Sequence, residues 1–544
     1  MHLNPLSIWV VLIGSVLALR ERAVSNQVTI DKRSDLRPQN HFGLNTYGGP
    51  PPIMHHDPET ARSMVEPMNL YIIWYGSNWK KADKTIVTDF LGGLSKSDFW
   101  KISQKYWQRM PDGSKKYITG NLKIAGQVDD HYSLGKFLYS PLETDYIENV
   151  VSVVVESHVK NGGLAYDPNG IAPNPTPGIN FTSPDYVYAF ISNPSACGTL
   201  MPYFCGASPN FKSPNGNVGV DVMLTFLAHE IAEAASNPDY PTVGWNTDPS
   251  FLGTENADLC NSIFGSNRKL DSKGGYYYNQ EWNGRRYLLQ QLWDPEIQQC
   301  GPVYNKATQD CTKFKKIFPT LNVGDDCCSS GYAECANGKI TGIDVSYNGL
   351  TGDANALVKK VNLNFPNINR LLLGGNDFTA TKVFPKALCD LLHLEDVWMD
   401  DSLWLSGTSL PDCLGNLSSL RIFGIEGSGL AGNIPSSIFK YSSPFILSLS
   451  HNNLTGTIPK SLARKSTLKG LYLNDNPLLH GAIPEGFDGF HGQSEGPSDE
   501  NGPYQYANFE KTKLCYKKGY KGPKGGAPEC TKAQLSEGSD KEDD

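Results

Sequence analysis

The sequence predicts a multidomain protein in which an N-terminal mixed α/β domain is followed by a C-terminal solenoid of repeated coils. The chain of 544 residues is too long for one hydrophobic core, so two or three domains are expected. The second half repeats an apolar pattern roughly every 24 residues. The first half instead contains separate β-rich segments and one long apolar helix.

Composition and charge narrow the class of function. Hydrophobic residues make up 39% of the chain and charged residues 19%, as in ordinary soluble globular proteins. The net charge of -8 and the isoelectric point of about 5.8 exclude proteins that bind nucleic acid through an overall positive charge.

The N-terminus predicts a signal peptide over residues 1–18. The apolar run "PLSIWVVLIGSVLAL" is short for a membrane span, and Val16 and Ala18 suit cleavage after Ala18. No Lys or Arg precedes the run, so an uncleaved anchor is the alternative. No second run of membrane length follows, and we therefore expect a secreted, extracellular protein without a membrane span after cleavage.

Cysteines and glycosylation motifs fit an extracellular compartment. The chain has 12 cysteines, and oxidising compartments favour disulfides. The order of the cysteines suggests six pairs, which are Cys197–Cys205, Cys260–Cys300, Cys311–Cys327, Cys328–Cys335, Cys389–Cys413 and Cys515–Cys530. Sequons predict glycosylation at Asn180, Asn416 and Asn453.

The C-terminal coils, residues 339–487, follow the pattern L-x-x-L-x-L-x-x-N-x-L of a leucine-rich repeat. The fifth coil, for example, has Leu447, Leu449, Asn452 and Leu454. Each coil offers a short strand whose leucines are buried only when coils stack. The asparagine turns inward and bonds loop backbone. Hydrogen bonds of this kind from successive coils form an asparagine ladder. Because Ser402 and Ser428 replace the asparagine in two coils, we expect a weaker ladder there.

These coils resemble plant-type leucine-rich repeats. Several continue as "NIPSSI", "TIPKSL" and "AIPEGF", and the segment "DDCCSSGYAECANGKITGIDVSYNGLTG" resembles the cysteine cap of such arrays. The cap is assigned to residues 306–338. The resemblance implies a role in recognition, and a structural spacer is the alternative.

Strand residues between the leucines should face the concave side of the array. Acidic residues interleaved with aromatic residues suit a basic peptide, an extracellular protein or a wall glycan. A solvated surface without a ligand is the alternative. The candidate ligand-binding residues are Asp344, Tyr347, Asp396, Trp398, Asp400, Asp401, Glu426, Tyr472 and Asp475.

The first half, residues 28–305, predicts a mixed α/β domain. "MNLYIIWYG" and "DYVYAFIS" are typical of strands because they are rich in β-branched and aromatic residues. The segment from Gly219 to Asp239 predicts a helix. "ENVVSVVVESHV" fits a helix or a strand, and a helix is favoured by the preceding "LETDY".

This half resembles the Exordium, or phosphate-induced protein, family of plant extracellular proteins. The resemblance lies in "NLYIIWYGSNW", "YSLGKFL", "NGNVGVDVML", "SNP", "IFGS" and "NGRRYLLQQLWDPEIQQC", in the family's order. It implies a secreted, cell-wall-associated protein linked to growth and nutrient response, with no settled biochemical activity. The chain departs from the family in lacking a cysteine pair before "YVYAF" and in having "AHEIAEAASNP" where many members have an apolar segment.

The long helix contains a candidate zinc site. His229 and Glu233 lie one turn apart, and "HEIAE" is a variant of the H-E-x-x-H zinc helix. Glu255 or Asp258 would supply a third ligand, and Glu230 would act as the base of a zincin-like hydrolase. In the alternative, the two glutamates pair with Arg285 or Arg286, and His229 is a buried hydrogen-bond donor.

The final residues, 488–544, are polar and glycine-rich, and they predict a mostly disordered tail. Two functions follow from the sequence. The favoured one is a secreted, wall-associated recognition or signalling protein with a ligand-binding repeat domain. The other is a zinc-dependent, peptidase-like hydrolase in which the repeats supply targeting.

Overall fold

The computed structural model divides into two compact units, with the division near Lys306. We call them the N-terminal unit and the repeat unit and describe each by itself. The described residues are 7–13, 54–55, 63–76, 79–131, 187–192, 212–238, 244–247, 255–303, 309–324, 326–379, 383–440, 442, 446–465, 467–468, 470–487, 491–492 and 506–537.

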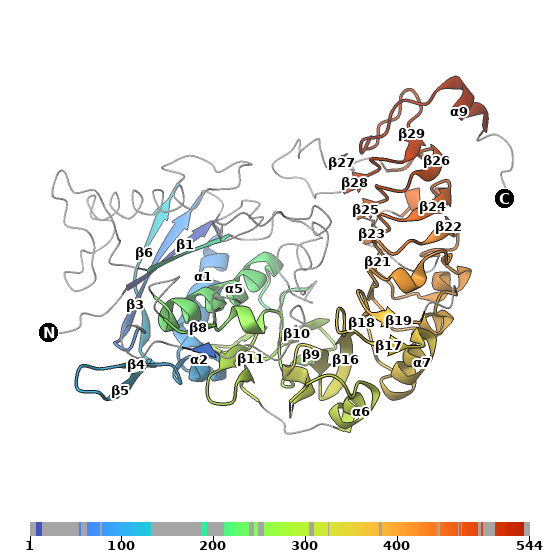
Figure 1. Cartoon of the computed structure of the whole chain (residues 1–544). Coiled ribbons are helices and arrows are strands. Elements are labelled where there is room, and N and C mark those ends of the chain that lie inside the picture. The colour runs from blue at the N-terminus through green and yellow to red at the C-terminus, as the bar shows by residue number, and fades with distance from the viewer. Residues whose placement is uncertain are drawn as a thin grey trace. The chain divides into compact units, whose positions relative to one another are not determined.

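The N-terminal unit contains a parallel four-stranded sheet in the order β6-β3-β1-β7 (Figure 1). Its strands are β1 (Ser7–Ile13), β3 (Met68–Tyr75), β6 (Leu122–Asp130) and β7 (Val187–Ser192). β3 is almost continuously buried, as expected for a parallel strand covered on both faces. The strands predicted from "MNLYIIWYG" and "DYVYAFIS" are therefore confirmed, whereas residues 148–159 lie outside the described part of the chain.

Three helices share a hydrophobic core with this sheet. They are α1 (Lys81–Leu94), α2 (Asp98–Ser103) and α5 (Val218–Ser236). Phe90 of α1, Trp100 of α2 and Leu227 of α5 are fully buried members of the same cluster as Ile72 of β3. An α/β domain is thus present, as the sequence predicts.

β1 falls inside the predicted signal peptide. In the structure Ser7–Ile13 pairs with β3 on one side and with β7 on the other, and so occupies an interior position of the sheet. The same apolar, β-branched composition that suits a signal peptide also suits a parallel strand. Cleavage after Ala18 would remove this strand from the sheet. The signal peptide stays a prediction, and it conflicts with the structural role that the segment has in the uncleaved chain.

Short antiparallel pairs complete the N-terminal unit. They are β2 (Met54–His55) with β8 (Asn246–Thr247), β4 (Trp107–Arg109) with β5 (Lys115–Tyr117), β9 (Lys269–Asp271) with β10 (Tyr276–Tyr278), β11 (Gln280–Trp282) with β12 (Arg285–Tyr287), and β13 (Leu292–Asp294) with β14 (Gln299–Gly301). The disulfide Cys260–Cys300 joins β14 to the short 3-10 turn η6 (Asp258–Cys260).

The repeat unit is built on a nine-stranded sheet whose strands follow one another nearly in sequence order. β15 is antiparallel to β16, and the remaining pairs are parallel. In spatial order the strands are β15 (Ala333–Ala336), β16 (Lys339–Asp344), β18 (Arg370–Leu372), β20 (Asp396–Trp398), β21 (Ile422–Gly424), β23 (Ile446–Ser448), β25 (Gly470–Tyr472), β28 (Tyr506–Asn508) and β27 (His491–Gly492).

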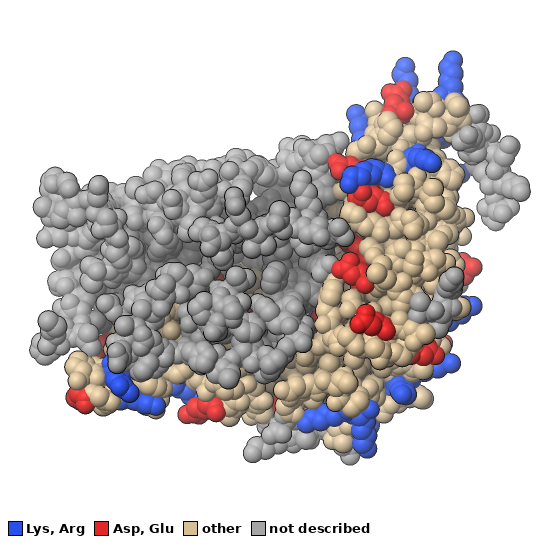
Figure 2. All heavy atoms as spheres, in the orientation of Figure 1, with Lys and Arg blue, Asp and Glu red and all other residues tan. Residues whose placement is uncertain are grey.

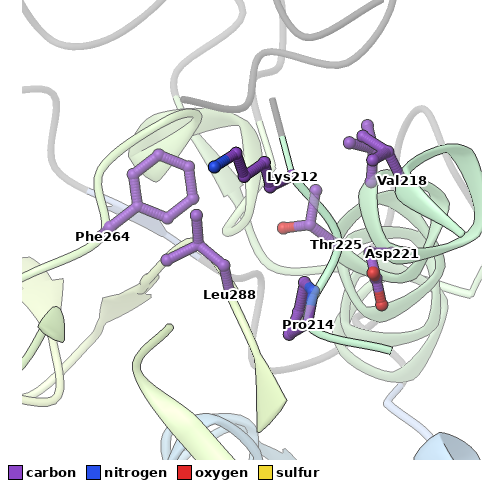
Figure 3. A pocket seen from close by; sticks show the side chains of 8 residues that line it. Lys212, Pro214, Val218, Asp221, Thr225, Phe264 and Leu288 are labelled. Atoms are coloured by element: carbon purple, nitrogen blue, oxygen red, sulfur yellow. The ribbon is translucent and has the colours of Figure 1, made fainter. Parts of the chain in front are cut away.

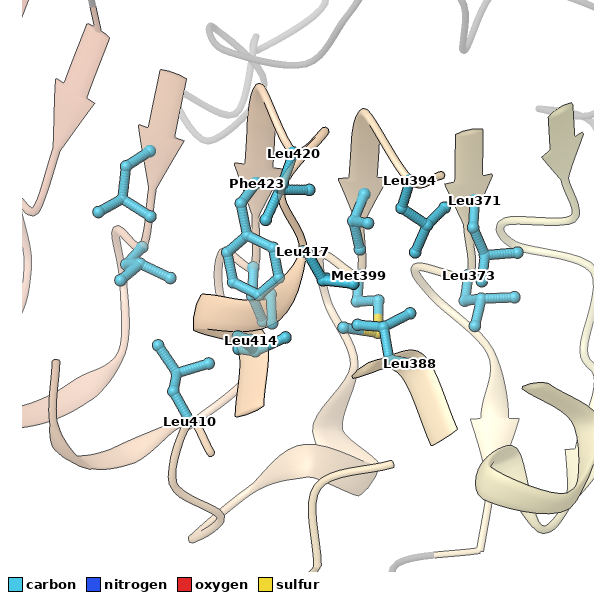
Figure 4. Packing of buried hydrophobic residues seen from close by; sticks show 14 of the residues in the cluster. Leu371, Leu373, Leu388, Leu394, Met399, Leu410, Leu414, Leu417, Leu420 and Phe423 are labelled. Carbon is cyan, nitrogen blue, oxygen red and sulfur yellow. The ribbon is translucent and has the colours of Figure 1, made fainter. Parts of the chain in front are cut away.

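Leucines at the predicted positions form one continuous core through this stack. Leu371, Leu394, Phe423 and Leu447 from successive coils are fully buried in a single cluster, and Figure 4 shows part of this packing. The pattern of the sixth coil, with Leu473 and Asn476, predicts Leu478 as its last core residue, and this position is wrong: Leu478 is 46% exposed, and Leu479 is buried in its place. The last coil therefore carries one extra residue between its asparagine and its core leucine.

The elements on the other side of each coil are short. The strands are β17 (Thr351–Gly352), β19 (Asp377–Phe378), β22 (Ala431–Asn433), β24 (Asn453–Gly456), β26 (Leu478–Ala482) and β29 (Lys513–Cys515). The helices are α6 (Gln309–Ile317), α7 (Ala354–Asn364), α8 (Lys460–Ala463) and α9 (Lys532–Glu537), with 3-10 turns η7 (Cys327–Ser329), η8 (Lys386–Asp390), η9 (Leu403–Leu405) and η10 (Asp412–Asn416).

The structure differs from the expected disordered tail over residues 506–537. This stretch contributes β28, β29 and α9, and Phe509 and Leu514 are buried in the repeat core. The disulfide Cys515–Cys530 closes it. A few apolar residues and one crosslink thus order a segment whose average composition is polar.

Four further disulfides are present as the cysteine order suggests. They are Cys260–Cys300, Cys311–Cys327, Cys328–Cys335 and Cys389–Cys413. Cys197, Cys205 and the sequon Asn180 lie outside the described residues. None of the helices in the described ranges has both the length and the apolar character needed to cross a membrane.

Candidate functional site

Helix α5 carries the candidate metal ligands. It begins after Asn217, whose side-chain oxygen accepts hydrogen bonds from Gly219 N at 3.1 Å and Val220 N at 3.3 Å. Leu224 and Leu227 on one side and Val222 on the other are all buried. A helix buried on both sides can keep polar groups only if they have partners.

His229 lies between two carboxylates. Its Nε2 is 3.1 Å from Glu233 Oε1, one turn further along α5, and 3.3 Å from Asp258 Oδ1, which η6 provides. The candidate ligand atoms of these three residues all lie within 4.8 Å of one another. Burial lowers the pKa of His229, but the two carboxylates outweigh it and raise the pKa well above its ordinary value. The three side chains therefore fit a single cation.

Glu255, the other candidate third ligand, is not part of this group. Its Oε1 accepts a hydrogen bond from Asn237 Nδ2 at 3.1 Å, and its backbone N–H donates to Asp258 Oδ2 at 3.3 Å. Of the two acids that the sequence proposes, the structure therefore brings Asp258 to His229, whereas the Glu255 side chain accepts from Asn237.

Glu230, the candidate base, follows His229 on the helix and is only partly buried. A helix turns about 100° per residue, so Glu230 leaves the line shared by His229 and Glu233. The two arginines of the alternative interpretation contact other carboxylates. Arg285 Nε lies 2.8 Å from Asp89, and Arg286 NH1 lies 2.5 Å from Asp271.

A pocket lies beside the N-terminal half of α5 (Figure 3). Phe264 and Leu288 line it together with Thr225, which is one turn before His229. The remaining lining residues are Lys212, Pro214, Val218, Asp221 and Val222. Burial raises the pKa of the Asp221 carboxyl to about 6, although Ser213 and Asn215 donate hydrogen bonds to it.

A second group of potential ligands is made of sulfur atoms. Cys311, Cys327 and Cys328 lie close together, but Cys311 is bonded to Cys327 and Cys328 to Cys335. Disulfide sulfurs are not thiolates, so this cluster offers no metal site.

Four of the predicted ligand-binding residues of the repeats, Asp344, Asp396, Trp398 and Tyr472, lie in strands of the nine-stranded sheet, and the other five follow the strands. In strand register, Asp344, Leu372, Trp398, Gly424, Ser448 and Tyr472 form one row across it. Because alternate strand residues point to opposite faces, this row faces away from the leucine core. Trp398 and Tyr472 are buried, yet neither belongs to the core cluster.

Among the described residues, those on and beside this face include more carboxylates than cations. Figure 2 shows Asp and Glu side chains along the repeat unit in that view, with Lys and Arg mainly near its two ends. Asp396 Oδ2 accepts from Arg370 Nε at 3.0 Å, and Glu334 contacts the same guanidinium. Asp400 Oδ1 accepts from Glu426 N at 2.9 Å.

One edge of the face carries a column of residues with left-handed backbone. Tyr347, Asp401, His451 and Asp475 all have φ between 51° and 58°. Asp475 lies 3.4 Å from His451 and 2.8 Å from Lys511. Burial raises the pKa of Asp475, but Lys511 and the neighbouring donors outweigh it and lower the pKa below its ordinary value.

Sequence reasoning missed three contributors to these sites. Asn237, Arg370 and Leu372 were not singled out, although each is an interaction partner or row neighbour of a predicted residue. Applying the repeat frame to every coil would have placed Arg370 beside Asp396 and Leu372 beside Trp398. Asn237 carried no signal beyond its place at the helix end.

Comparisons with known proteins agree with the division into two units. The model of the phosphate-induced protein 1 conserved region matches residues 55–303, and a leucine-rich repeat model matches residues 445–464. The chain is 30% identical over 287 residues to Protein EXORDIUM-like 3 of Arabidopsis thaliana, covering 43% of this chain and 79% of that protein. It is 27% identical over 269 residues to Protein PHOSPHATE-INDUCED 1 of Nicotiana tabacum, covering 43% and 83%.

Among solved structures, the chain is similar to a TDR receptor. The TM-score is 0.25 at 21% identity, and the match covers 32% of this chain and 27% of the receptor chain. The chain thus spans about a quarter of that receptor's length.

Proposed function

Because the chain belongs to the phosphate-induced protein 1, or Exordium, family, we propose that it is a secreted, cell-wall-associated plant protein of extracellular recognition or signalling. In this proposal the repeat unit supplies the ligand-binding surface. Five disulfides in the described residues support an oxidising compartment.

Secretion has a direct test at the N-terminus. We expect the mature protein to begin after Ala18, since the run before it suits a signal peptide. Sequencing the N-terminus of the secreted protein measures this. A mature chain that still contains Ser7–Ile13 would show that the segment is not removed, and β1 would then be available to pair with β3 and β7.

The observation that carries the recognition proposal is Trp398. Its side chain is only 1% exposed and lies outside the leucine core, and in the described part of the chain its indole N–H has no hydrogen-bond acceptor. A buried donor without an acceptor costs about 1–3 kcal/mol, which a ligand oxygen would offset. Aromatic residues of this kind dominate binding at protein interfaces.

The carboxylates around Trp398 favour a basic ligand. Asp396 and Asp400 flank it on β20 and on the residues that follow, and Glu426 lies in the next coil. A face rich in carboxylates attracts a cationic peptide more strongly than a neutral wall glycan. Because these side chains are buried, we also expect slow association, as in binding that requires a conformational change.

An array of peptides and glycans probed with the full chain tests this proposal. The informative variant is Trp398→Phe, which removes the indole N–H while keeping an aromatic ring. Trp404→Phe is the matched control, since its indole N–H also has no acceptor among the described residues but its ring belongs to the core. Loss of basic-peptide binding in the first variant only is expected. Equal binding by both variants and the wild type would refute a role for this face, and selective glycan binding would replace the peptide as ligand.

A second candidate function is a metal-dependent hydrolase of peptidase type, with the repeats as a targeting module. The approach of His229, Glu233 and Asp258 to within 4.8 Å supports it. A bound zinc ion would supply Lewis acidity toward water and a substrate carbonyl. In this reading Glu230 accepts the proton of the attacking water. Elemental analysis of the full chain, with Glu233→Ala for comparison, tests the zinc, and peptide hydrolysis with Glu230→Gln tests the chemistry.

A further inference from the structure

We propose that His229, Glu233 and Asp258 form a site for a divalent cation, and that the buried pair Asn237–Glu255 positions its ligands. The inference rests on the metal site named as the second candidate above, and it adds residues that hold the site without touching the ion. It does not depend on hydrolysis.

Charge balance favours a divalent ion at this position. Glu233 is 1% exposed, and its Oε1 and Asp258 Oδ1 both approach His229 Nε2, so two carboxylates converge on one nitrogen atom. Two carboxylates held this close repel one another unless a cation lies between them. A divalent cation neutralises both carboxylates, while a neutral imidazole nitrogen completes the donor set.

The site is also open to solvent on one side. The Asp258 side chain is 41% exposed, whereas those of His229 and Glu233 are 9% and 1% exposed. An ion can therefore enter past Asp258, and water can complete its coordination. One nitrogen and two oxygen donors suit zinc and manganese, and the group contains no thiolate for softer ions.

Asn237 links the two elements that provide the ligands. It follows α5, and its backbone N–H donates to Glu233 O at 2.7 Å. Its side-chain Nδ2 donates to Glu255 Oε1 at 3.1 Å, and Glu255 N in turn donates to Asp258 Oδ2 at 3.3 Å. The chain of contacts thus runs from the ligand on the helix to the ligand on η6.

The Asn237 side chain is itself fixed by packing. It is buried, and a Cβ added to Gly244 would lie 2.0 Å from Asn237 Oδ1. Glu255 is likewise buried. Partners that hydrogen-bond metal ligands directly change metal affinity by about 10- to 100-fold when they are removed. The Asn237 side chain acts one contact further out, through Glu255.

Metal titration of the full chain tests the inference. After treatment with chelator, Zn²⁺ and Mn²⁺ are each titrated by calorimetry, and thermal unfolding is measured with and without the ion. We expect one ion per chain, raised thermal stability on binding, and no binding by His229→Ala. Asp221→Asn, a variant of another acid on the same helix, should bind as the wild type does.

Two variants separate positioning from ligation. Asn237→Ala should weaken binding by about tenfold, the lower end of the range for direct partners of metal ligands, while keeping one ion per chain. Glu255→Gln keeps an acceptor oxygen for Asn237, so we expect affinity close to the wild type and retained folding even if Asn237→Ala unfolds. Wild-type affinity in Asn237→Ala would overturn the positioning role, and loss of binding in Glu255→Gln would show that Glu255 is a ligand.

The outcomes also distinguish this inference from the hydrolase. A chain that binds metal as described but cleaves no peptide refutes the hydrolase alone. A wild-type chain that binds neither ion overturns the site and the hydrolase together and leaves the recognition proposal standing.

Discussion

The hydroxyl of Tyr347 donates a hydrogen bond to Asp401 Oδ2 at 2.6 Å, although the two residues belong to coils separated by a third. The ring of Tyr347 spans the intervening coil by lying over Gly375, where an added Cβ would fall 2.1 Å from Tyr347 Cδ1. A glycine in the middle coil thus lets the outer two coils interact directly.

Gly375→Ala should therefore destabilise the repeat unit by about 3 kcal/mol, from a left-handed backbone and from displacement of the Tyr347 ring. Gly349→Ala is the matched control, since both glycines have a φ of 61° but a Cβ at Gly349 meets nothing within 4 Å. Its cost should be about 1 kcal/mol. Denaturant unfolding of the full chain measures both, and equal costs would mean that the ring moves freely.

The asparagine ladder provides a second comparison. Asn452 Nδ2 donates to Ile425 O at 2.7 Å and to Leu449 O at 3.0 Å, and its Oδ1 accepts from Leu430 N at 2.9 Å. Ser428, at the same position of the preceding coil, donates through its hydroxyl to Met399 O at 3.0 Å and accepts from Ser402 N at 2.9 Å. We expect Asn452→Ala to cost about 3 kcal/mol and Ser428→Ala about 2 kcal/mol, since each lost hydrogen bond contributes about 1 kcal/mol.

The denaturant concentrations at the unfolding midpoints of the two variants measure the difference in stability, provided that the free energy of unfolding falls with denaturant at the same slope in both. A Ser428→Ala variant that loses as much stability as Asn452→Ala would show that serine supports the ladder as well as asparagine does. The sequence-based expectation of a weaker ladder in those coils would then be wrong.

The repeats could be predicted because each coil reports the same geometry several times. The regular spacing of leucines and asparagines fixes which residues are buried. Where one coil departs from the pattern, the spacing in the neighbouring coils still identifies the equivalent position. The exception is Leu478, where one inserted residue exchanges it for Leu479 in the core. The spacing of residues therefore predicts burial only in coils that contain no inserted residue.

The metal site could be predicted only in part, for a physical reason. Two residues one turn apart on a helix must share a face, so His229 and Glu233 follow from spacing alone. Glu255 and Asp258 come from a separate segment, and their side chains point differently because Asn237 binds one of them. That choice depends on a tertiary hydrogen bond, which no spacing encodes.

The buried Asp221 gives a prediction about pH. Its pKa is raised to about 6, above the ordinary value of 3.8, so between these values the folded chain keeps a proton that the unfolded chain has lost. Stability from this group is complete below pH about 4 and is lost as the pH rises through about 6. In Asp221→Asn, which does not titrate, the decline between these pH values should be reduced. Thermal unfolding from pH 4 to pH 7 measures it, and parallel curves for variant and wild type would contradict the raised pKa.

Metal binding should depend on pH in the opposite direction. The pKa of His229 is held well above its ordinary value by Glu233 and Asp258, so the metal-free imidazole is protonated at neutral pH. Only the neutral imidazole binds a cation, and each bound ion must therefore displace one proton. The apparent Kd for Zn²⁺ should fall by about tenfold for each unit of rising pH below that pKa. Calorimetric titration of the full chain at pH 6, 7 and 8, in buffers of different ionisation enthalpy, measures the affinity and the released proton. An affinity that stays constant over this range, with no proton released, would mean that His229 is not the nitrogen ligand.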